Sequence, residues 1–243
     1  FELNFNLGWV QTFLATDTAR RRVDADPAFK AKLEQLLDRI DAMDGEFDRM
    51  PLAGDDLMRD LAPYYDDWLA HPAHGAFWDK LKIDGNYGEL DVAALHVGAW
   101  YDIFLGGTIQ NYLGMHAGAK TEQARKAQHL LIGPWAHITG ITLGPVGEYD
   151  PGVRSSHIAI DFDGLHLRWY DRWLRDADNG IDDDPPVRIF VMGPNRWRHE
   201  QEWPLARTRY VDWFFASNGR ANTLNGDGVL SEETPGPDGN RPD

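Results

Sequence analysis

Two ionisable residues, Asp102 and His137, each follow an apolar run that ends in a turn. The run before Asp102 is Leu95-His96-Val97-Gly98-Ala99-Trp100-Tyr101, and the run before His137 is Leu131-Ile132-Gly133-Pro134-Trp135-Ala136. An Asp that accepts the N–H of a His fixes the tautomer of the imidazole, and the His can then carry a proton to and from a nucleophile. The pattern is that of the Asp and His of a nucleophile–His–Asp relay. By spacing alone, an Asp in such a turn is more often a helix cap, and a His after Gly-Pro-Trp is more often a packed loop residue.

The nucleophile of such a relay has no candidate in this chain. Cys is absent, which excludes a Cys nucleophile, a disulfide and a Cys-ligated metal. In α/β enzymes with this relay the order is Ser, Asp, His, so the Ser should precede Asp102. The serines that come later lack the flanking glycines of a nucleophile elbow: Ser155, Ser156, Ser217 and Ser231. Because the chain begins at Phe1 rather than Met and ends in a loop-like stretch, we expect an internal piece of a longer protein.

Two buried parallel strands must position the pair. Residues 92–97 form a short apolar run between glycines, and residues 129–132 form a second one that should end at Gly133-Pro134. Such runs are typical of parallel strands, and open α/β sheets place their ligands past the carboxyl ends of these strands. Helical patterns follow each run, the second over residues 163–175. The sequence therefore predicts the α/β class, with further strands expected before Phe1 because two strands make no sheet.

Residues 1–88 carry helical patterns only. Asp26 can cap a helix that begins with Pro27, and Gly45 should end it. Its apolar residues fall on one face at helical spacing: Phe29, Leu33, Leu36, Leu37, Ile40 and Met43. Further helices are expected around residues 9–14, 56–61, 64–69 and 73–81. A block of this kind is typical of a separate helical layer.

The pattern becomes all β after a polar, proline-ended linker at residues 176–186. Strands are expected over residues 187–192, 207–216 and 229–230, with turns at residues 193–195 and 217–219. This is typical of the opening of a β-sandwich. The expected domains are residues 1–88, 89–180 and 185–243.

The composition excludes some classes of binding partner but says little about the substrate. The net charge of −15 argues against nucleic acid and against anionic membrane surfaces as partners. The contents of 42% hydrophobic and 26% charged residues are typical of a globular protein. No apolar stretch of the sequence is long enough to span a bilayer. Oligomers stay open, and so does the compartment, with the cytoplasm slightly favoured.

Several segments together resemble one family of hydrolases. Residues 98–102 and 132–137 look like the Asp and His motifs of the CocE/NonD hydrolases. That family includes the cocaine esterases and is related to the α-amino-acid ester hydrolases and the X-Pro dipeptidyl-peptidases. The likeness continues through residues 167–174, 187–198 and 202–205, and so covers most of residues 90–235 in the same order.

The resemblance implies a serine hydrolase in three parts. These are an α/β-hydrolase core, of which residues 89–180 would be the C-terminal part, a helical cap at residues 1–88, and a jelly-roll β-sandwich that begins at residues 185–243. It implies that Asp102 is the triad acid, that His137 is the base, and that Phe104 lines the acyl pocket. The intact enzyme would hydrolyse small-molecule esters, with amides as the less favoured alternative, through an acyl-enzyme with no cofactor or metal. The nucleophilic Ser and the oxyanion Tyr of the family lie upstream, so this chain alone should be inactive.

Alternatives within and beyond the family remain. The α-amino-acid ester hydrolases carry acidic residues just after the triad Asp, whereas residues 103–107 here are apolar and small, which favours a neutral acyl group. The X-Pro dipeptidyl-peptidases have a different Asp motif. A non-catalytic binding protein on the same fold is the reading from another class. A metal cluster of His157, Asp161, Asp163 and His166 matches no ligand motif, and Asp161 or Asp163 is better read as a helix cap.

Overall fold

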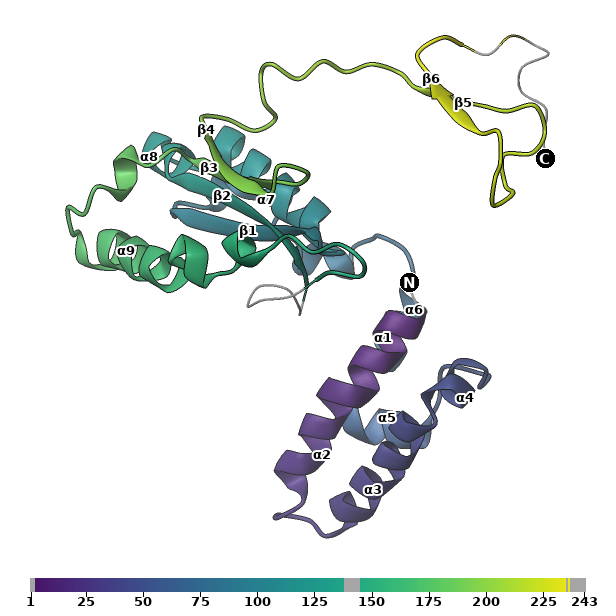
Figure 1. The fold of residues 1–243 in the computed structure, drawn as a ribbon. Coiled ribbons are helices and arrows are strands. Elements are labelled where there is room, and N and C mark those ends of the chain that lie inside the picture. The colour runs from purple at the N-terminus through teal and green to yellow at the C-terminus, as the bar shows by residue number, and fades with distance from the viewer. Residues whose placement is uncertain (1–2, 138–144, 235, 237–243) are drawn as a thin grey trace. The chain divides into compact units, whose positions relative to one another are not determined.

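The chain divides into two units, Phe1–Lys82 and Ile83–Asp243 (Figure 1). The structure, a computed structural model, describes residues 3–137, 145–234 and 236. The first unit is helical and the second contains all the strands of the described residues.

The helices of the first unit form where the sequence predicts them with two exceptions: the helix that follows Asp26 ends at Asp41 rather than at Gly45, and residues 73–81 form no α-helix. Three segments run on without a break at its start: α1 (Leu3–Trp9), the π-helix η1 (Val10–Ala15) and α2 (Thr16–Arg22). The others are α3 (Ala28–Asp41), α4 (Met43–Phe47), α5 (Asp56–Leu61) and α6 (Tyr64–Ala70). The Oδ1 atom of Asp26 accepts the Ala28 N–H, as a residue capping α3 should. The core of the unit includes the fully buried side chains of Leu7, Val10, Leu36, Met58 and Leu61.

The prediction of a helix over residues 73–81 is wrong. Only a 3-10 turn, η2 (Trp78–Lys80), forms there. Pro72 favours an extended residue before it, and Gly75 is a poor helix former, so a short isolated segment does not gain enough to nucleate. The indole N–H of Trp78 instead donates to the carbonyl of His71 at 2.7 Å.

A buried carboxylate, Asp55, joins α3 and α5 to the loop after α4. Its Oδ1 accepts the N–H of Met58 at 3.1 Å and caps α5. Its Oδ2 lies 2.5 Å from Nη1 of Arg39 and 2.8 Å from Nη1 of Arg49. Burial alone would raise the pKa of Asp55, but the hydrogen bonds from Arg39 and Met58 and the two guanidinium charges outweigh it and hold the pKa below its usual value.

The sheet of the second unit has the order β1-β2-β3-β4. Its strands are β1 (Ala94–Tyr101), β2 (Gln128–Ala136), β3 (Val187–Val191) and β4 (Arg196–Glu200). The first three strands run parallel, with His96 opposite Leu130 and Leu131 opposite Arg188, and β4 is antiparallel to β3. The strand expected at the start of the sandwich therefore continues the α/β sheet. The hairpin strand β4 follows the predicted turn and was not itself predicted.

Helices lie on both faces of this sheet (Figure 1). One face packs on α7 (Leu105–Gly118), with α8 (Glu122–Lys126) after it, through Leu130, Ile132, Val187 and Ile189. The other face, with Leu131 and Trp135, packs on α9 (Phe162–Arg175) and on the 3-10 turn η5 (Ile158–Ile160). Further 3-10 turns are η3 (Tyr87–Glu89), η4 (Val153–Ser155) and η6 (Ile181–Asp183). Asp161 caps α9 by accepting the Gly164 N–H, as one reading of the sequence predicts.

Two strand predictions need correction. Strand β2 does not end at Gly133-Pro134 but runs to Ala136; its pairing with β3 ends at Ile132, so Pro134 removes no hydrogen bond from that ladder. The strand expected over residues 207–216 is regular only in β5 (Phe214–Ala216), which pairs antiparallel with β6 (Val229–Ser231). In the described part of the chain residues 207–213 have no ladder partner, and a strand without one leaves its backbone groups to water.

Candidate active site

A tight turn at the end of β1 fixes the carboxylate of Asp102. The backbone N–H of Asp102 donates to the carbonyl of Ala99 at 3.0 Å, and its carbonyl accepts from Leu105 at 3.1 Å. Its Oδ1 accepts the N–H of Phe104 at 2.8 Å. Helix α7 begins directly after this turn and packs closely on β1 at Gly98, where a Cβ would lie 2.9 Å from the Leu105 side chain. The turn therefore leaves Oδ2 free to meet another group.

A bulge at the end of β2 brings His137 to that carboxylate. Ala99 lies opposite Gly133, but Tyr101 lies opposite Ala136, so β2 has one residue more than β1 over this span. The ring of Trp135 folds back over Gly133, where an added Cβ would lie 2.4–2.6 Å from ring atoms. Its indole N–H donates to the carbonyl of Ser155 at 2.8 Å. The buried Trp135 thus packs the bulge and does not face a substrate.

The three residues predicted from the sequence meet at this edge of the sheet. His137 Nδ1 lies 3.1 Å from Asp102 Oδ2. The edge of the Phe104 ring meets the imidazole at a centroid distance of 4.8 Å and an interplanar angle of 77°. The Asp102 side chain is 16% exposed and that of His137 is 42% exposed, so the far side of the imidazole is open. A His held in this way can carry a proton at Nε2.

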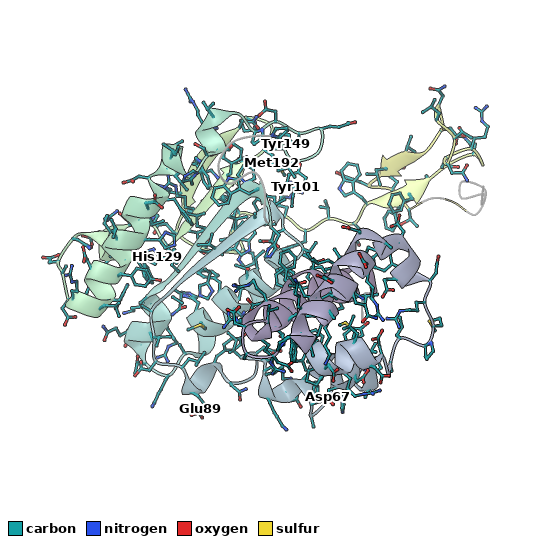
Figure 2. All side chains as sticks on the ribbon, turned by 90° about the horizontal axis from the view of Figure 1, so that it is seen from below. Asp67, Glu89, Tyr101, His129, Tyr149 and Met192 are labelled. Carbon is teal, nitrogen blue, oxygen red and sulfur yellow. The ribbon has the colours of Figure 1, made fainter. Side chains whose placement is uncertain are left out.

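Two tyrosines beside the pair had no signal in the sequence analysis. Tyr101 directly precedes Asp102, and its ring lies 6.0 Å from that of Tyr149, measured between centroids. Figure 2 shows both side chains at the same end of the sheet. The Tyr149 hydroxyl donates to Oδ1 of Asn195 at 2.6 Å, and Asn195 lies in the β3–β4 turn with a φ of 47°. The position of Tyr101 next to Asp102 was the one available clue.

A hollow of about 460 Å³ lies beside Phe104. Among the described residues, the lining holds no carboxylate and no cationic side chain other than a His: His96, Val97, Ile103, Phe104, Gly107, Thr108 and Asn111. Burial lowers the pKa of His96, more than its hydrogen bond with Gln128 raises it, so this ring is neutral at pH 7. The hollow therefore suits an uncharged group.

The remaining candidates take local roles. The Ser155 hydroxyl donates to the Gly152 carbonyl at 2.6 Å, and the hydroxyl oxygen of Ser156 accepts the Ala159 N–H at 3.2 Å. Those of Ser217 and Ser231 accept backbone N–H groups two residues on. Within residues 3–137, 145–234 and 236, no three His, Asp or Glu side chains gather as metal ligands would, and no helix is both long and apolar enough to cross a bilayer.

Sequence comparisons find relatives along nearly the whole chain. The family model of the X-Pro dipeptidyl-peptidases (S15 family) matches residues 1–139, and the model of the X-Pro dipeptidyl-peptidase C-terminal non-catalytic domain matches residues 179–241. Cocaine esterase from Rhodococcus sp. (strain MB1 Bresler) is 30% identical over 231 residues, which cover 95% of this chain and 38% of the esterase. The chain thus spans well under half the length of this curated relative.

Two solved structures share the fold. An aminopeptidase from the marine sediment archaeon Thaumarchaeota archaeon matches with a TM-score of 0.53 at 22% identity, over 73% of this chain and 27% of that one. An α-amino acid ester hydrolase matches with a TM-score of 0.54 at 23% identity, over 75% and 29%. At these identities the likeness concerns the fold alone. It confirms the predicted class, an α/β-hydrolase-like sheet followed by an antiparallel pair that is consistent with the start of a β-sandwich.

Proposed function

Because the chain belongs to the X-Pro dipeptidyl-peptidase (S15) family and is CocE/NonD-like within it, we propose that it supplies the acid and the base of a serine hydrolase. The proposed reaction of the intact protein is the hydrolysis of small carboxylic esters through an acyl-enzyme. The observation that carries the proposal is the 3.1 Å approach of His137 Nδ1 to Asp102 Oδ2 past the ends of two adjacent parallel strands. In this proposal residues 1–88 are the cap and 89–180 belong to the C-terminal part of the core, which β3 and β4 extend to Glu200. The remainder of the expected domain 185–243, with β5 and β6, begins the jelly-roll.

The geometry suits proton transfer by His137. With its proton on Nδ1, the imidazole donates to Asp102 and presents an unprotonated Nε2 to a nucleophile. Nε2 takes the proton of a serine hydroxyl as its oxygen attacks the ester carbonyl, and then gives that proton to the departing alkoxide. A water activated in the same way releases the acid. Asp102 stays ionised throughout and stabilises the imidazolium.

In this proposal the serine comes from outside these 243 residues, which contain no Gly-x-Ser-x-Gly elbow. Strand β1 is the outer strand of the described sheet, so one of its edges is free for a further parallel strand. A nucleophile carried on a neighbouring strand end would face His137, because the carboxyl ends of parallel strands meet at one edge of a sheet. This placement completes the triad without any change to the described part of the site.

The hollow beside Phe104 supports a neutral acyl group. Among the described residues its lining offers apolar contacts and no carboxylate to pair with an ammonium group. An α-amino-acid ester, which carries such a group, would lose its hydration there without compensation. We therefore place aromatic or alkyl acyl groups before aminoacyl groups as substrates.

The family description favours a second candidate, X-Pro dipeptidyl-peptidase activity. The same triad would serve it, because acyl transfer to a serine cleaves amides as well as esters. The two activities differ in the acyl group, which for a dipeptidyl-peptidase ends in a free ammonium. The 30% identity to an esterase over 95% of the chain supports ester hydrolysis as the first candidate.

The test uses the intact protein with matched chromogenic substrates. We expect hydrolysis of 4-nitrophenyl butyrate and benzoate, little release from Gly-Pro-4-nitroanilide, and covalent labelling by a fluorophosphonate that His137→Gln abolishes. Preferential cleavage of the anilide would favour the peptidase instead. Absence of both labelling and turnover in folded protein would favour a non-catalytic binding protein on this fold.

A further inference from the structure

A second pocket lies at the other end of the sheet. It encloses about 280 Å³ between α9 and the amino-terminal ends of β1, β2 and β3. Leu95, Leu131 and Leu165 form part of an apolar wall, and His129, Arg188 and His199 form a polar one. The strand register places Leu131 and His199 on either side of Arg188. His199 is exposed, so the pocket opens to solvent.

Arg188 brings a guanidinium with unused donors into this pocket. Its Nε–H is buried and has no hydrogen-bond partner within the described parts of the chain. Its Nη1 makes one long contact, 3.5 Å to the carbonyl of Ile160, and its Cζ lies 5.3 Å from the centroid of the Trp197 ring. Among the described carboxylates none lies within ion-pair distance of it. A buried donor left unpaired costs the free energy of its lost hydration, so this arrangement favours an added acceptor.

The neighbouring charges already have partners. Asp184 forms an ion pair with Arg168 at 3.0 Å, and the carboxylate of Asp161 caps α9. His129 meets the Trp169 ring edge-on at 5.2 Å. Burial lowers the pKa of His129 and of His199, so both rings are uncharged at pH 7. Arg188 is therefore the cation whose charge is left for an incoming group.

The lining also limits the class of that group. The fork of Nε–H and Nη–H on a guanidinium matches the two oxygens of a carboxylate. The nearby carboxylates of Asp161 and Asp184 would repel a dianion such as phosphate more than a monoanion. The apolar wall offers contact to a hydrocarbon or aromatic body of a few carbon atoms.

This pocket is distinct from the candidate active site. Leu95 is near the start of β1 and Asp102 follows its end, a separation of about 23 Å at about 3.3 Å per residue. Figure 2 shows His129 near one end of the strands and Tyr101 near the other. A ligand in the pocket would not touch the triad, so the inference does not depend on the proposed function.

We propose that this pocket is a second binding site, which takes a small monocarboxylate with an apolar or aromatic body. Its carboxylate would accept hydrogen bonds from Nε and one Nη of Arg188. Its body would lie against Leu95, Leu131 and Leu165.

The test locates a carboxylate probe directly. Crystals of the intact protein are soaked with 4-bromobenzoate, and the bromine is located by anomalous diffraction. We expect a bromine peak against Leu165, with the carboxylate on Arg188. In solution, calorimetry should show the benzoate affinity falling about tenfold in Arg188→Met, equivalent to about 1.4 kcal/mol. Arg196→Met, which removes an exposed guanidinium on β4, should leave the affinity unchanged.

A second variant keeps the proposal testable if Arg188→Met does not fold. Leu165→Phe fills the pocket without removing the guanidinium and should abolish the bromine peak. The proposal is overturned if no bromine density appears at Arg188, or if inorganic phosphate binds there and benzoate does not. It is also overturned if a carboxylate from another part of the intact protein occupies Arg188. Retained benzoate binding in folded Leu165→Phe would contradict the placement of the body.

Discussion

The two carboxylate oxygens of Asp102 have separate partners, so its contact with His137 can be tested without loss of the turn. One oxygen accepts the Phe104 N–H and the other faces His137. Asp102→Asn keeps the shape but can present an N–H where His137 needs an acceptor, which disfavours the working tautomer. Replacing the Asp of Ser-His-Asp triads by Asn lowers kcat by about 10⁴-fold. We expect a comparable fall in the hydrolysis of 4-nitrophenyl esters by the intact protein, with KM little changed.

Asp150→Asn is the matched control, because Asp150 likewise accepts the N–H of the residue two positions on but is exposed and has no ion pair with a His among the described residues. It should retain the activity of the unsubstituted protein. Equal losses in the two variants would show that the turn matters and the relay does not.

Phe104 should govern the choice of acyl group. Its ring is 47% exposed, lies against the imidazole and borders the uncharged hollow. Phe104→Leu keeps apolar volume but removes the ring face, so kcat/KM for 4-nitrophenyl benzoate should fall about tenfold and that for the acetate should change less. Steady-state kinetics on both esters measure the ratio. An unchanged ratio would remove Phe104 from the acyl pocket; Phe215→Leu, at a ring that is 82% exposed on β5, is the control.

Asp102 and His137 could be singled out because relay chemistry restricts residue types and strand ends restrict positions, whereas Phe104 was singled out by the family resemblance alone. Tyr149 and Asn195 could not, because their hydrogen bond joins residues 46 positions apart. It also depends on the turn in which Gly193 has a φ of 90°, a local geometry that fixes the direction of Asn195. Long-range contacts of this kind follow from the folded turn and leave no spacing signal.

At the scale of elements, the bulge in β2 is the feature that aims His137. Gly133→Ala would drive a methyl group into the Trp135 ring, which is buried and held by Ser155. We expect a loss of about 2 kcal/mol in unfolding free energy, typical of overpacking, together with a fall in kcat because His137 shifts. Urea unfolding and ester kinetics measure the two effects. Gly106→Ala, at a helical site with open space, should not destabilise the protein; equal effects would assign the loss to backbone freedom.

The elements were predictable where pattern and capping agree. Helix α5 has the predicted bounds, and Asp55 caps it by accepting the Met58 N–H. The prediction fails where pairing with a distant strand determines the bounds of an element. Gly133-Pro134 predicts a strand end, but β2 continues to pair with β1 beyond it. Strand β3 reads as part of a sandwich, but its register with β2 extends the α/β sheet. Pairing between distant segments is invisible to a local pattern.

At the scale of the whole molecule, the two units should respond separately to acid and to mutation. The pKa of Asp55 is lower in the folded state than its usual value of 3.8, so the unfolded chain binds the proton first as pH falls. The stability from Asp55 is therefore present above about pH 4 and is lost as pH falls through the lowered folded pKa. Asp55→Asn should remove about 3 kcal/mol at pH 7, because it leaves Arg39 and Arg49 without their buried partner.

Calorimetry of the intact protein can assign that loss to one unit. Asp55→Asn should lower the transition of Phe1–Lys82 and leave that of the sheet in place, whereas Gly133→Ala should do the reverse. Asp56→Asn is the control, since Asp56 is the next residue along the chain and its own carboxylate is 93% exposed. A single transition that moves equally in both variants would show that the units unfold together.

The absence of an elbow Ser should leave the chain produced alone without hydrolase activity. The 243 residues hold an acid and a base but no nucleophile, and a triad without its nucleophile retains only residual catalysis. We expect the chain produced alone to take up no fluorophosphonate and to hydrolyse 4-nitrophenyl butyrate no faster than its own His137→Gln variant. Near-UV circular dichroism checks that the aromatic core is packed, so that inactivity is not read from an unfolded chain.

Adding the part of the intact protein that carries the nucleophile should restore labelling. Asp102→Asn in the chain should leave binding of that part intact while lowering turnover. Labelling of the chain alone would place the nucleophile within it, and mass spectrometry would identify which of Ser155, Ser156, Ser217 and Ser231 carries the adduct.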